Sequence, residues 1–480
     1  WALFQKHVGG GLPVTAVIYS HTHGDHWGGV RGLIREDDVR AGKVEVIAPA
    51  DFMDFTISEN VYAGNAMNRR LFYQYGLLLP ASPHGYVGQG LGQGVSAGTP
   101  GLIAPTRYVK DPIEEFEVDG VRMIFQKYIA EALYRFGFEA EVMFASHHWP
   151  RWGNARIQEV LRDQRDLYAH MNNQVLHLAN QGVTINQIHN VYRLPESILQ
   201  KWHCRGYHGS PEHNARGVIQ RYLGFWDCNP ATLIPLSPED SAPLYVEMMG
   251  GAAKIIARGR ELHDTGQYLL ATEIVNKLVQ AEPGNTEAKD LLADIFEQLG
   301  YQQENPGLRN SFLAAAYELR TGIPQGETAS SSSPDVIRAM STELFLNFLA
   351  IRMDSRKVEG LRFTMNLVTP DNGEQFIVEL ENATLTNIQG FRAEKADLTL
   401  TINRADLELT MMGAKKLEDQ LKDGTARADG DVGILTRLAA AMVEFDPRFE
   451  IMPGTKASTD TAMATPADPY EAEPGRIIPE

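Results

Sequence analysis

A cluster of three histidines and one aspartate within six residues offers the most chemistry in the sequence. It reads HTHGDH, and its candidate ligands are His21, His23, Asp25 and His26. Neutral imidazole and carboxylate groups are natural ligands of zinc. With this spacing, His21 and His23 can face one metal ion while Asp25 and His26 face another. The cluster therefore predicts a metal centre rather than a histidine-rich surface loop.

The elements around this cluster must hold it at the end of a strand. Residues 14–20 are apolar and β-branched and end directly before His21, and residues 44–49 form a second strand candidate after a helical pattern. Strand, helix and strand in this order predict an α/β domain. Gly24 is expected to permit a tight turn, and Gly28–Gly29 a close approach of the backbone.

Length, charge and cysteine content exclude several classes of protein. The chain has 480 residues, which predicts about three domains at the usual size of about 150 residues each. The net charge of −17 argues against general binding of nucleic acid, which needs a basic surface. No segment approaches the roughly 20 apolar residues that span a membrane. Only Cys204 and Cys228 occur, which excludes a disulfide scaffold but leaves one disulfide open.

Changes in composition along the chain predict three domains and a tail. We expect an α/β domain over 1–154, a helical domain over 155–322, an α+β domain over 335–455 and an extended tail over 456–480. Apolar residues recur at helical spacing in the second domain, which also contains one tetratricopeptide-type hairpin within 252–300. A polar segment rich in serine separates the last two domains.

Several smaller elements can be predicted with their bounds. Strands at 113–118 and 121–126 flank Asp119–Gly120, a dipeptide typical of hairpin turns. A strand, EVMFAS, is expected to end at His147. The α+β domain is expected to contain a helix at 335–352, strands at 361–368, 375–380 and 398–402, and helices near 404–412 and 431–444.

The motif HTHGDHWGGVRGL (21–33) resembles the metallo-β-lactamase superfamily and, within it, the alkylsulfatases that hydrolyse dodecyl sulfate and related esters. Further similarity lies in GLIAPT (101–106), FASHHWPRWGN (144–154), HLANQG (177–182), KWHCRGYHGSPEHN (201–214) and RYLGFWDCNPA (221–231). The resemblance implies a metallo-β-lactamase αββα sandwich, a helical dimerisation domain and a sterol-carrier-like α+β C-terminal domain. It also implies a homodimer, and we expect a periplasmic or secreted location.

The resemblance further implies a binuclear centre with two zinc ions per subunit. Its ligands here would be His21, His23, Asp25, His26 and His147. His148 is the alternative to His147. The family's two glutamate ligands and its sulfate-binding arginine lie in a segment that has no counterpart in this sequence. Three glutamates occur in the corresponding part of the chain but resemble ordinary exposed residues: Glu131, Glu139 and Glu141.

The implied reaction is the hydrolysis of an alkyl sulfate to an alcohol and sulfate by a water activated on zinc. Asp25 would help to orient that water as well as bind metal. Tyr207 and His208 are candidate hydrogen-bond donors to the sulfate, and His208 is also a candidate acid. Alternatively, their motif only builds a domain interface. Two other functions stay open: hydrolysis of lactones or thioesters, and lipid binding with a degenerate metal site.

The junction Gln126–Lys127 joins a predicted strand directly to a predicted helix. No turn residue separates them, although such a connection normally takes about two to six residues. The resemblance breaks at the same place. We therefore expect an internal segment to be missing after Gln126. It is either deleted or disordered, and in the second case the disorder would follow from absent or depleted zinc.

Apolar side chains of the C-terminal domain have two interpretations. They form either a groove that recruits amphiphiles or an ordinary core. The residues concerned are Phe345, Phe348, Leu349, Ile351, Phe363 and Leu367.

Overall fold

The structure is a computed structural model that describes residues 1–92, 94, 98–126, 133–323 and 332–456. The predicted junction at Gln126–Lys127, Glu131 and nearly all of the predicted tail therefore lie outside the described residues. Contacts divide the chain into two units. The first comprises Trp1–Asn68, Ser96–Phe125 and Thr328–Pro447, and the second comprises Arg69–Val95, Gln126–Glu327 and Arg448–Glu480.

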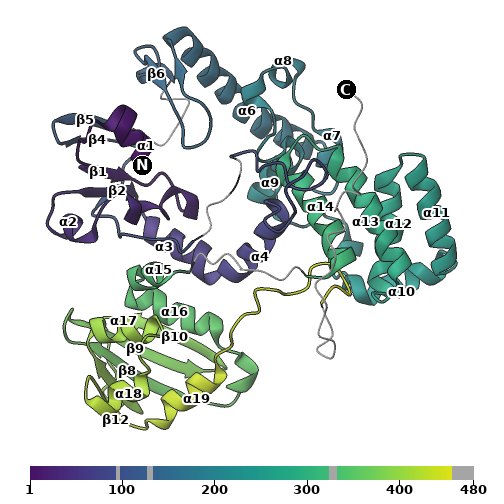
Figure 1. Cartoon of the computed structure of the whole chain (residues 1–480). Coiled ribbons are helices and arrows are strands. Elements are labelled where there is room, and N and C mark those ends of the chain that lie inside the picture. The colour runs from purple at the N-terminus through teal and green to yellow at the C-terminus, as the bar shows by residue number, and fades with distance from the viewer. Residues whose placement is uncertain (93, 95–97, 127–132, 324–331, 457–480) are drawn as a thin grey trace, which may run out of the picture. The chain divides into compact units, whose positions relative to one another are not determined.

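A three-stranded parallel sheet in the first unit carries the histidine motif (Figure 1). Its strands, in spatial order, are β1 (Ala16–Ile18), β2 (Glu45–Pro49) and β3 (Arg107–Val109). The central strand β2 is buried at Val46, Ile47 and Ala48, as expected of a parallel strand with neighbours on both sides. The strand predicted at 14–20 is shorter and less buried than expected, because β1 pairs only with β2 among the described strands.

Short elements complete the N-terminal part of the first unit. They are α1 (Ala2–Phe4), η1 (Gln5–Gly9), η2 (Gly24–His26), η3 (Val30–Gly32), α2 (Glu36–Arg40), α3 (Phe52–Ile57) and the π-helix η4 (Ser58–Tyr62). The next helix, α4 (Gly64–Gln74), begins in the first unit and ends in the second. The predicted hairpin is confirmed as β4 (Ile113–Val118) and β5 (Val121–Gln126). Its turn residues Asp119 and Gly120 have φ angles of 49° and 77°, the positive values that this dipeptide tolerates.

The C-terminal α+β domain also belongs to the first unit and is built on a five-stranded sheet of order β10-β9-β8-β11-β12. The strands are β8 (Phe363–Thr369), β9 (Glu374–Glu381), β10 (Thr384–Gln389), β11 (Leu398–Ile402) and β12 (Ala426–Gly430). The helices are α15 (Pro334–Ala339), α16 (Thr342–Arg352), η7 (Ser355–Lys357), α17 (Arg404–Met411), α18 (Leu417–Asp423) and α19 (Gly433–Ala441). Figure 1 shows these helices packed around the sheet.

One expectation for this domain is wrong, and one open question is decided in part. The single helix predicted at 335–352 is two helices, because the Ser341 side chain accepts a hydrogen bond from the Leu344 amide at 3.2 Å and starts α16 afresh. Of the two interpretations of its apolar side chains, the ordinary core holds for Phe345, Phe363 and Leu367, which are buried in the hydrophobic core.

Helices dominate the second unit, as the sequence predicts. They include α6 (Asn154–Asn180), α7 (Ile188–Val191), α8 (Glu196–Leu199), η5 (Trp202–Cys204), α9 (Pro211–Leu223), η6 (Pro230–Thr232), α10 (Pro238–Met248), α11 (Ala252–Asp264), α12 (Tyr268–Ala281), α13 (Thr286–Tyr301) and α14 (Pro306–Thr321). The pair α12 and α13 is the predicted hairpin. Two very short strands, β6 (Val142–Met143) and β7 (Arg151–Trp152), precede α6 in the chain. His147 therefore lies between two strands and does not end one, contrary to expectation.

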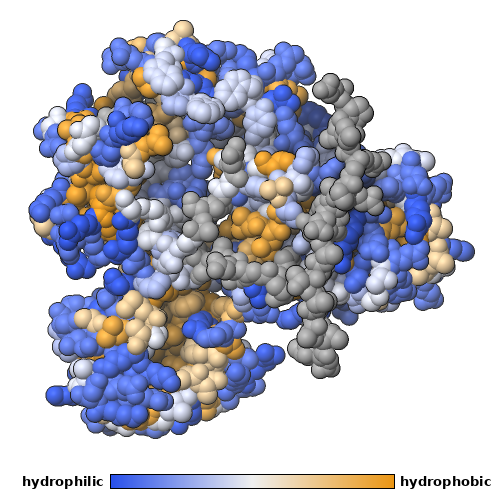
Figure 2. All heavy atoms as spheres, viewed as in Figure 1, coloured by the Kyte–Doolittle hydropathy of each residue, from blue (hydrophilic) through white to orange (hydrophobic). Residues whose placement is uncertain are grey.

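Surface and cysteine features complete the description. Hydrophilic residues occupy most of the face drawn in Figure 2. Among the described residues, no helix is both long and apolar enough to cross a membrane. Both cysteines are free, so the disulfide that the sequence left open is not formed; Cys204 is buried and Cys228 is exposed.

Candidate metal centre

The backbone turn after β1 is held from inside the first unit. Trp27 is 2% exposed and donates its indole N–H to the Thr22 carbonyl at 2.9 Å. The Gly28 amide donates to the Gly24 carbonyl at 2.7 Å, and the Gly101 amide donates to the Gly28 carbonyl at 2.8 Å. A Cβ on Gly28 would lie 2.6 Å from the Gly24 oxygen, so the predicted close approach is real. At Gly24 a Cβ would meet only the Trp27 ring at 3.8 Å, so this position does not require glycine.

Two histidines of the turn point their ring nitrogens at one another. His21 Nε2 lies 3.0 Å from His23 Nδ1. Two nitrogen ligands on one tetrahedral zinc, each at about 2.0–2.1 Å, are roughly 3.3 Å apart. The observed separation is close to that value, so the spacing of the two nitrogens suits a shared ion.

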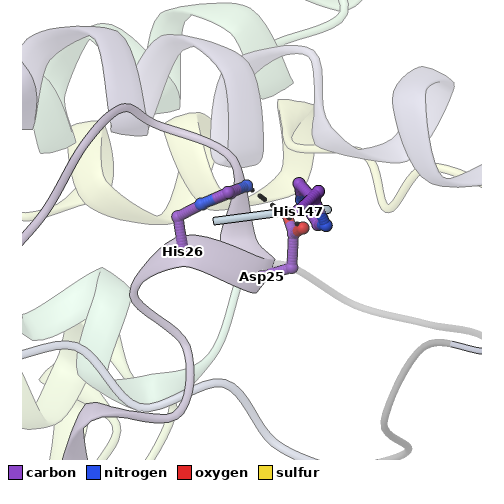
Figure 3. A group of neighbouring side chains, drawn as sticks. All are labelled: Asp25, His26 and His147. Carbon is purple, nitrogen blue, oxygen red and sulfur yellow. Dashed lines mark ion pairs between the residues drawn. The ribbon is translucent and has the colours of Figure 1, made fainter. Parts of the chain in front are cut away.

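Asp25 and His26 form a second pair, drawn with its ion pair dashed in Figure 3. His26 Nε2 lies 3.2 Å from Asp25 Oδ2, and the His26 side chain is only 8% exposed. The His21 and His26 rings are 4.0 Å apart between centroids. Ser20 joins the two pairs, because its Oγ lies 3.0 Å from His21 Nδ1 and 3.4 Å from His26 Nδ1.

The electrostatic setting of His21 favours metal binding. Burial lowers its pKa, and the neighbouring His26 and His23 lower it further. A lowered pKa keeps the imidazole neutral near pH 7, and the neutral ring is the form that binds metal. The donor types, their convergence and this pKa together fit a metal ion at the turn.

Glu59, which the sequence analysis did not identify, also belongs to this cluster. Its Oε1 lies 3.2 Å from His23 Nε2, and its Oε2 accepts a hydrogen bond from Thr22 Oγ1 at 2.6 Å. Glu59 comes from the π-helix η4, far from the motif in sequence. No spacing pattern links it to the histidines, so only the fold reveals it.

The remaining predicted site residues lie in the second unit. His147 Nδ1 is 3.2 Å from the Leu91 carbonyl oxygen. His148 has a φ of 89°, an unusual conformation for a residue with a side chain. Glu139 and Glu141 are exposed, as predicted. The structure thus brings together His21, His23, Asp25 and His26, while the participation of His147 stays a prediction.

Comparison with known proteins identifies the family. Residues 2–147 match the metallo-beta-lactamase superfamily, 184–322 match alkyl sulfatase dimerisation, and 330–454 match alkyl sulfatase C-terminal. A linear primary-alkylsulfatase of Pseudomonas sp. is 39% identical over 489 residues, which cover 92% of this chain and 73% of the relative. The chain belongs to the alkylsulfatase family. It is therefore an enzyme of the alkylsulfatase type on a metallo-β-lactamase fold.

Other alkylsulfatases extend this result. An alkyl/aryl-sulfatase of Saccharomyces cerevisiae is 37% identical over 496 residues, covering 93% of this chain and 76% of its own. The solved structure of a stereoselective inverting sec-alkylsulfatase from Pseudomonas sp. has a TM-score of 0.90 at 35% identity, covering 94% of this chain and 79% of its own. Both sequence alignments are longer than the 480 residues of this alkylsulfatase. Each relative therefore has residues without a counterpart here, and the predicted break after Gln126 stays a prediction.

The loop that carries Tyr207 and His208, the predicted sulfate-binding residues of the alkylsulfatase, packs against other segments of the second unit. The His208 ring stacks on Tyr75, with 6.2 Å between centroids and 1° between planes. A Cβ on Gly90 would lie 2.2 Å from the Tyr207 carbonyl oxygen, so the two segments touch through their backbones. These contacts show a packing role for the loop, while the sulfate-binding role of Tyr207 and His208 stays a prediction.

Proposed function

We propose that this alkylsulfatase hydrolyses alkyl sulfate esters, dodecyl sulfate among them, to an alcohol and inorganic sulfate at a centre of two zinc ions. The observation that carries the proposal is the convergence of His21 Nε2 and His23 Nδ1 next to the pair Asp25 and His26. The alkylsulfatase names of the relatives support the substrate class. With a net charge of −17, the chain also needs a local positive charge to attract an anionic ester.

The proposed ligand assignment follows the two pairs. His21 and His23 hold one ion, Asp25 and His26 hold the other, and His147 joins the second. Bound zinc would supply a water that deprotonates near neutral pH and would offset part of the sulfate charge. The chain itself orients the ligands: Ser20 Oγ contacts His21 and His26 through their Nδ1 atoms, which leaves each Nε2 facing the centre.

Three polar residues have proposed roles toward the ester. Asp25 would orient the attacking water as well as bind metal. Tyr207 and His208 would donate hydrogen bonds to sulfate oxygens, and His208 would supply a proton to the departing group. The overall reaction consumes one water and yields ROH and hydrogen sulfate from ROSO3⁻, with no redox change.

Metal analysis and product assays of the full chain test this function. We expect zinc to co-purify or to restore activity after chelation, with sulfate release from sodium dodecyl sulfate. Lactone and thioester substrates serve as comparators and should react at least 100-fold more slowly. A chain that binds zinc but prefers a lactone or thioester, or one that binds no zinc, would refute the proposal.

We also propose a homodimer formed through the matched dimerisation segment, 184–322. Large apolar side chains are exposed along the stretch from the end of α9 through α10, and a second copy would cover them. They include Leu223, Phe225, Ile234, Leu236, Leu244 and Met248. Light scattering at micromolar concentration should give the mass of a dimer. Ile234→Asp should shift it toward the monomer, whereas Ile388→Asp, at an exposed site in the C-terminal domain, should not.

A further inference from the structure

We infer that Glu59 is a positioning residue for the metal centre, which fixes the orientation and tautomer of the His23 ring. This inference rests on the proposed function, because it assumes that His23 binds zinc. Glu59 lies outside the predicted ligand set, and nothing in the motif or in the family similarity points to it. It acts through His23 and does not itself contact the substrate.

The contact geometry defines which ring nitrogen is left for the metal. His23 Nε2 lies 3.2 Å from Glu59 Oε1. The negative carboxylate oxygen beside Nε2 favours the tautomer that carries the ring proton on that atom. The lone pair of the neutral ring is then on Nδ1, the atom that lies 3.0 Å from His21 Nε2. The carboxylate thus turns the metal-binding nitrogen of His23 toward the nitrogen of His21.

The second carboxylate oxygen anchors Glu59 to the same turn. Glu59 Oε2 accepts from Thr22 Oγ1 at 2.6 Å, and Thr22 stands between His21 and His23 in the chain. With one oxygen on each neighbour, the carboxylate plane is fixed at two points. Glu59 is 29% exposed at its side chain, against 56% for His23, so the more buried partner orients the more exposed ring.

The π-helix η4 places Glu59 rigidly. Asn60, the next residue, is 1% exposed and donates from Nδ2 to the Thr22 carbonyl at 3.1 Å and to the Thr56 carbonyl at 3.0 Å. The Asn60 side chain therefore links η4 by hydrogen bonds to α3 and to the HTHGDH turn (21–26). Single π-helical turns occur frequently at functional sites. The carboxylate beside His23 lies on such a turn.

The test compares two substitutions of Glu59 with a matched control in the full-length protein. Glu59→Ala removes the acceptor, and Glu59→Gln keeps the shape and one acceptor but removes the charge. The control Glu115→Gln changes an exposed glutamate of the first unit that pairs with Arg122 in the β4–β5 hairpin. Zinc affinity is measured by competition with a chromogenic chelator, and the unfolding midpoint is measured on metal-free protein. The visible spectrum of the cobalt-substituted protein reports ligand geometry.

We expect zinc to bind about 10- to 100-fold more weakly to Glu59→Ala, which is the usual cost of losing such an outer partner of a ligand. Glu59→Gln should lose less zinc affinity than Glu59→Ala. The cobalt spectrum should change in both variants. Glu115→Gln should match the parent in zinc affinity and in spectrum. If Glu59→Ala fails to fold, Glu59→Gln still decides the question.

Two results separate the inference from the proposed function. If the parent binds zinc and both Glu59 variants bind it equally well with unchanged cobalt spectra, the positioning role is refuted and the zinc hydrolase stands. If a variant lowers only the metal-free unfolding midpoint, Glu59 is merely structural and the inference is again refuted. Absence of zinc binding by the parent would overturn both.

Discussion

Two glutamates in the molecule accept hydrogen bonds from their neighbours but in opposite environments. In the second unit, both oxygens of Glu318 accept from Arg69 Nη2, at 2.8 and 2.7 Å, and Oε1 also accepts from Thr455 Oγ1 at 3.0 Å. Arg69 Nε donates to the Phe449 carbonyl at 2.8 Å. The two charged side chains are 1% and 2% exposed. Glu59 in the first unit is instead partly exposed and faces a histidine.

The difference separates a cluster that stabilises the fold from one suited to binding. Arg69 and Glu318 satisfy one another and the backbone, so a ligand would have to break the network to enter. Burial and the nearby Glu318 also raise the pKa of Tyr73, as expected in a dry and negatively charged setting. At the turn, His21 and His23 face each other with ring nitrogens that an ion can bridge. The first arrangement predicts a loss of stability on mutation, and the second a loss of activity.

Removal of a metal ligand should have the largest effect. His21→Ala or Asp25→Ala should lower hydrolysis more than 1,000-fold, because losing one ligand disorders the centre and the water it activates. The unfolding midpoint of the metal-free protein should barely change, since Asp25 is 45% exposed. Sulfate release and thermal unfolding measure the two effects. His177→Ala, at an exposed histidine of α6, serves as the control. Near-normal turnover in Asp25→Ala would contradict the assignment of the turn to activity.

Removal of one buried charge should produce the opposite result. Arg69→Ala leaves Glu318 buried without its cation and should destabilise the second unit by about 3–5 kcal/mol. Urea unfolding followed by helical ellipticity measures this loss. Zinc affinity of protein that remains folded should be unchanged. Arg122→Ala, which removes an exposed ion pair with Glu115, should unfold like the parent. An unaltered urea midpoint for Arg69→Ala would contradict the assignment of this pair to stability.

The sequence predicted the fold best where strands are central and apolar. β8, β9 and β11 were predicted nearly in full, and they occupy the middle of the five-stranded sheet. The missed strands, β10 and β12, are its two edges. Their sequences, TLTNIQ and ARADG, are polar or small, because an edge strand is partly solvated and must avoid further pairing. The apolar signal that marks the central strands is therefore weaker where the sheet ends.

The site was predictable only where its residues are close in sequence. The spacing within HTHGDH predicted four candidate ligands, because one turn holds them all. Glu59 is separated from Thr22 by 37 positions, and Glu318 from Arg69 by 249. In both cases a common residue type acquires its role from tertiary packing. A single sequence has no pattern that marks such a partner.

A smaller effect should come from the backbone beneath the histidines. Gly28→Ala places a Cβ 2.6 Å from the Gly24 carbonyl oxygen, so the turn must shift, at a cost of about 1–3 kcal/mol. The adjacent Gly29→Ala is a close control, because nothing lies within 4 Å of a Cβ there. We expect weaker zinc binding and a lower unfolding midpoint for Gly28→Ala alone. Equal zinc affinities and unfolding midpoints for the two variants would show that the turn adjusts to the added Cβ without cost.

The smallest effect concerns the two thiols of the second unit, one buried and one exposed, which test the effect of burial on reactivity. Burial, with Asp163 adding to it, raises the pKa of Cys204 to about 11. At pH 8 only about 0.1% of this thiol is then the reactive thiolate, and raising the pH toward 10 should increase that fraction roughly 100-fold. Cys228 is exposed. Iodoacetamide at pH 8 should therefore label the native parent once, label denatured protein twice and leave native Cys228→Ser unlabelled, as intact mass would show. Rapid labelling of native Cys228→Ser would mean that the reagent reaches Cys204 in the folded protein, and burial would then not protect this thiol.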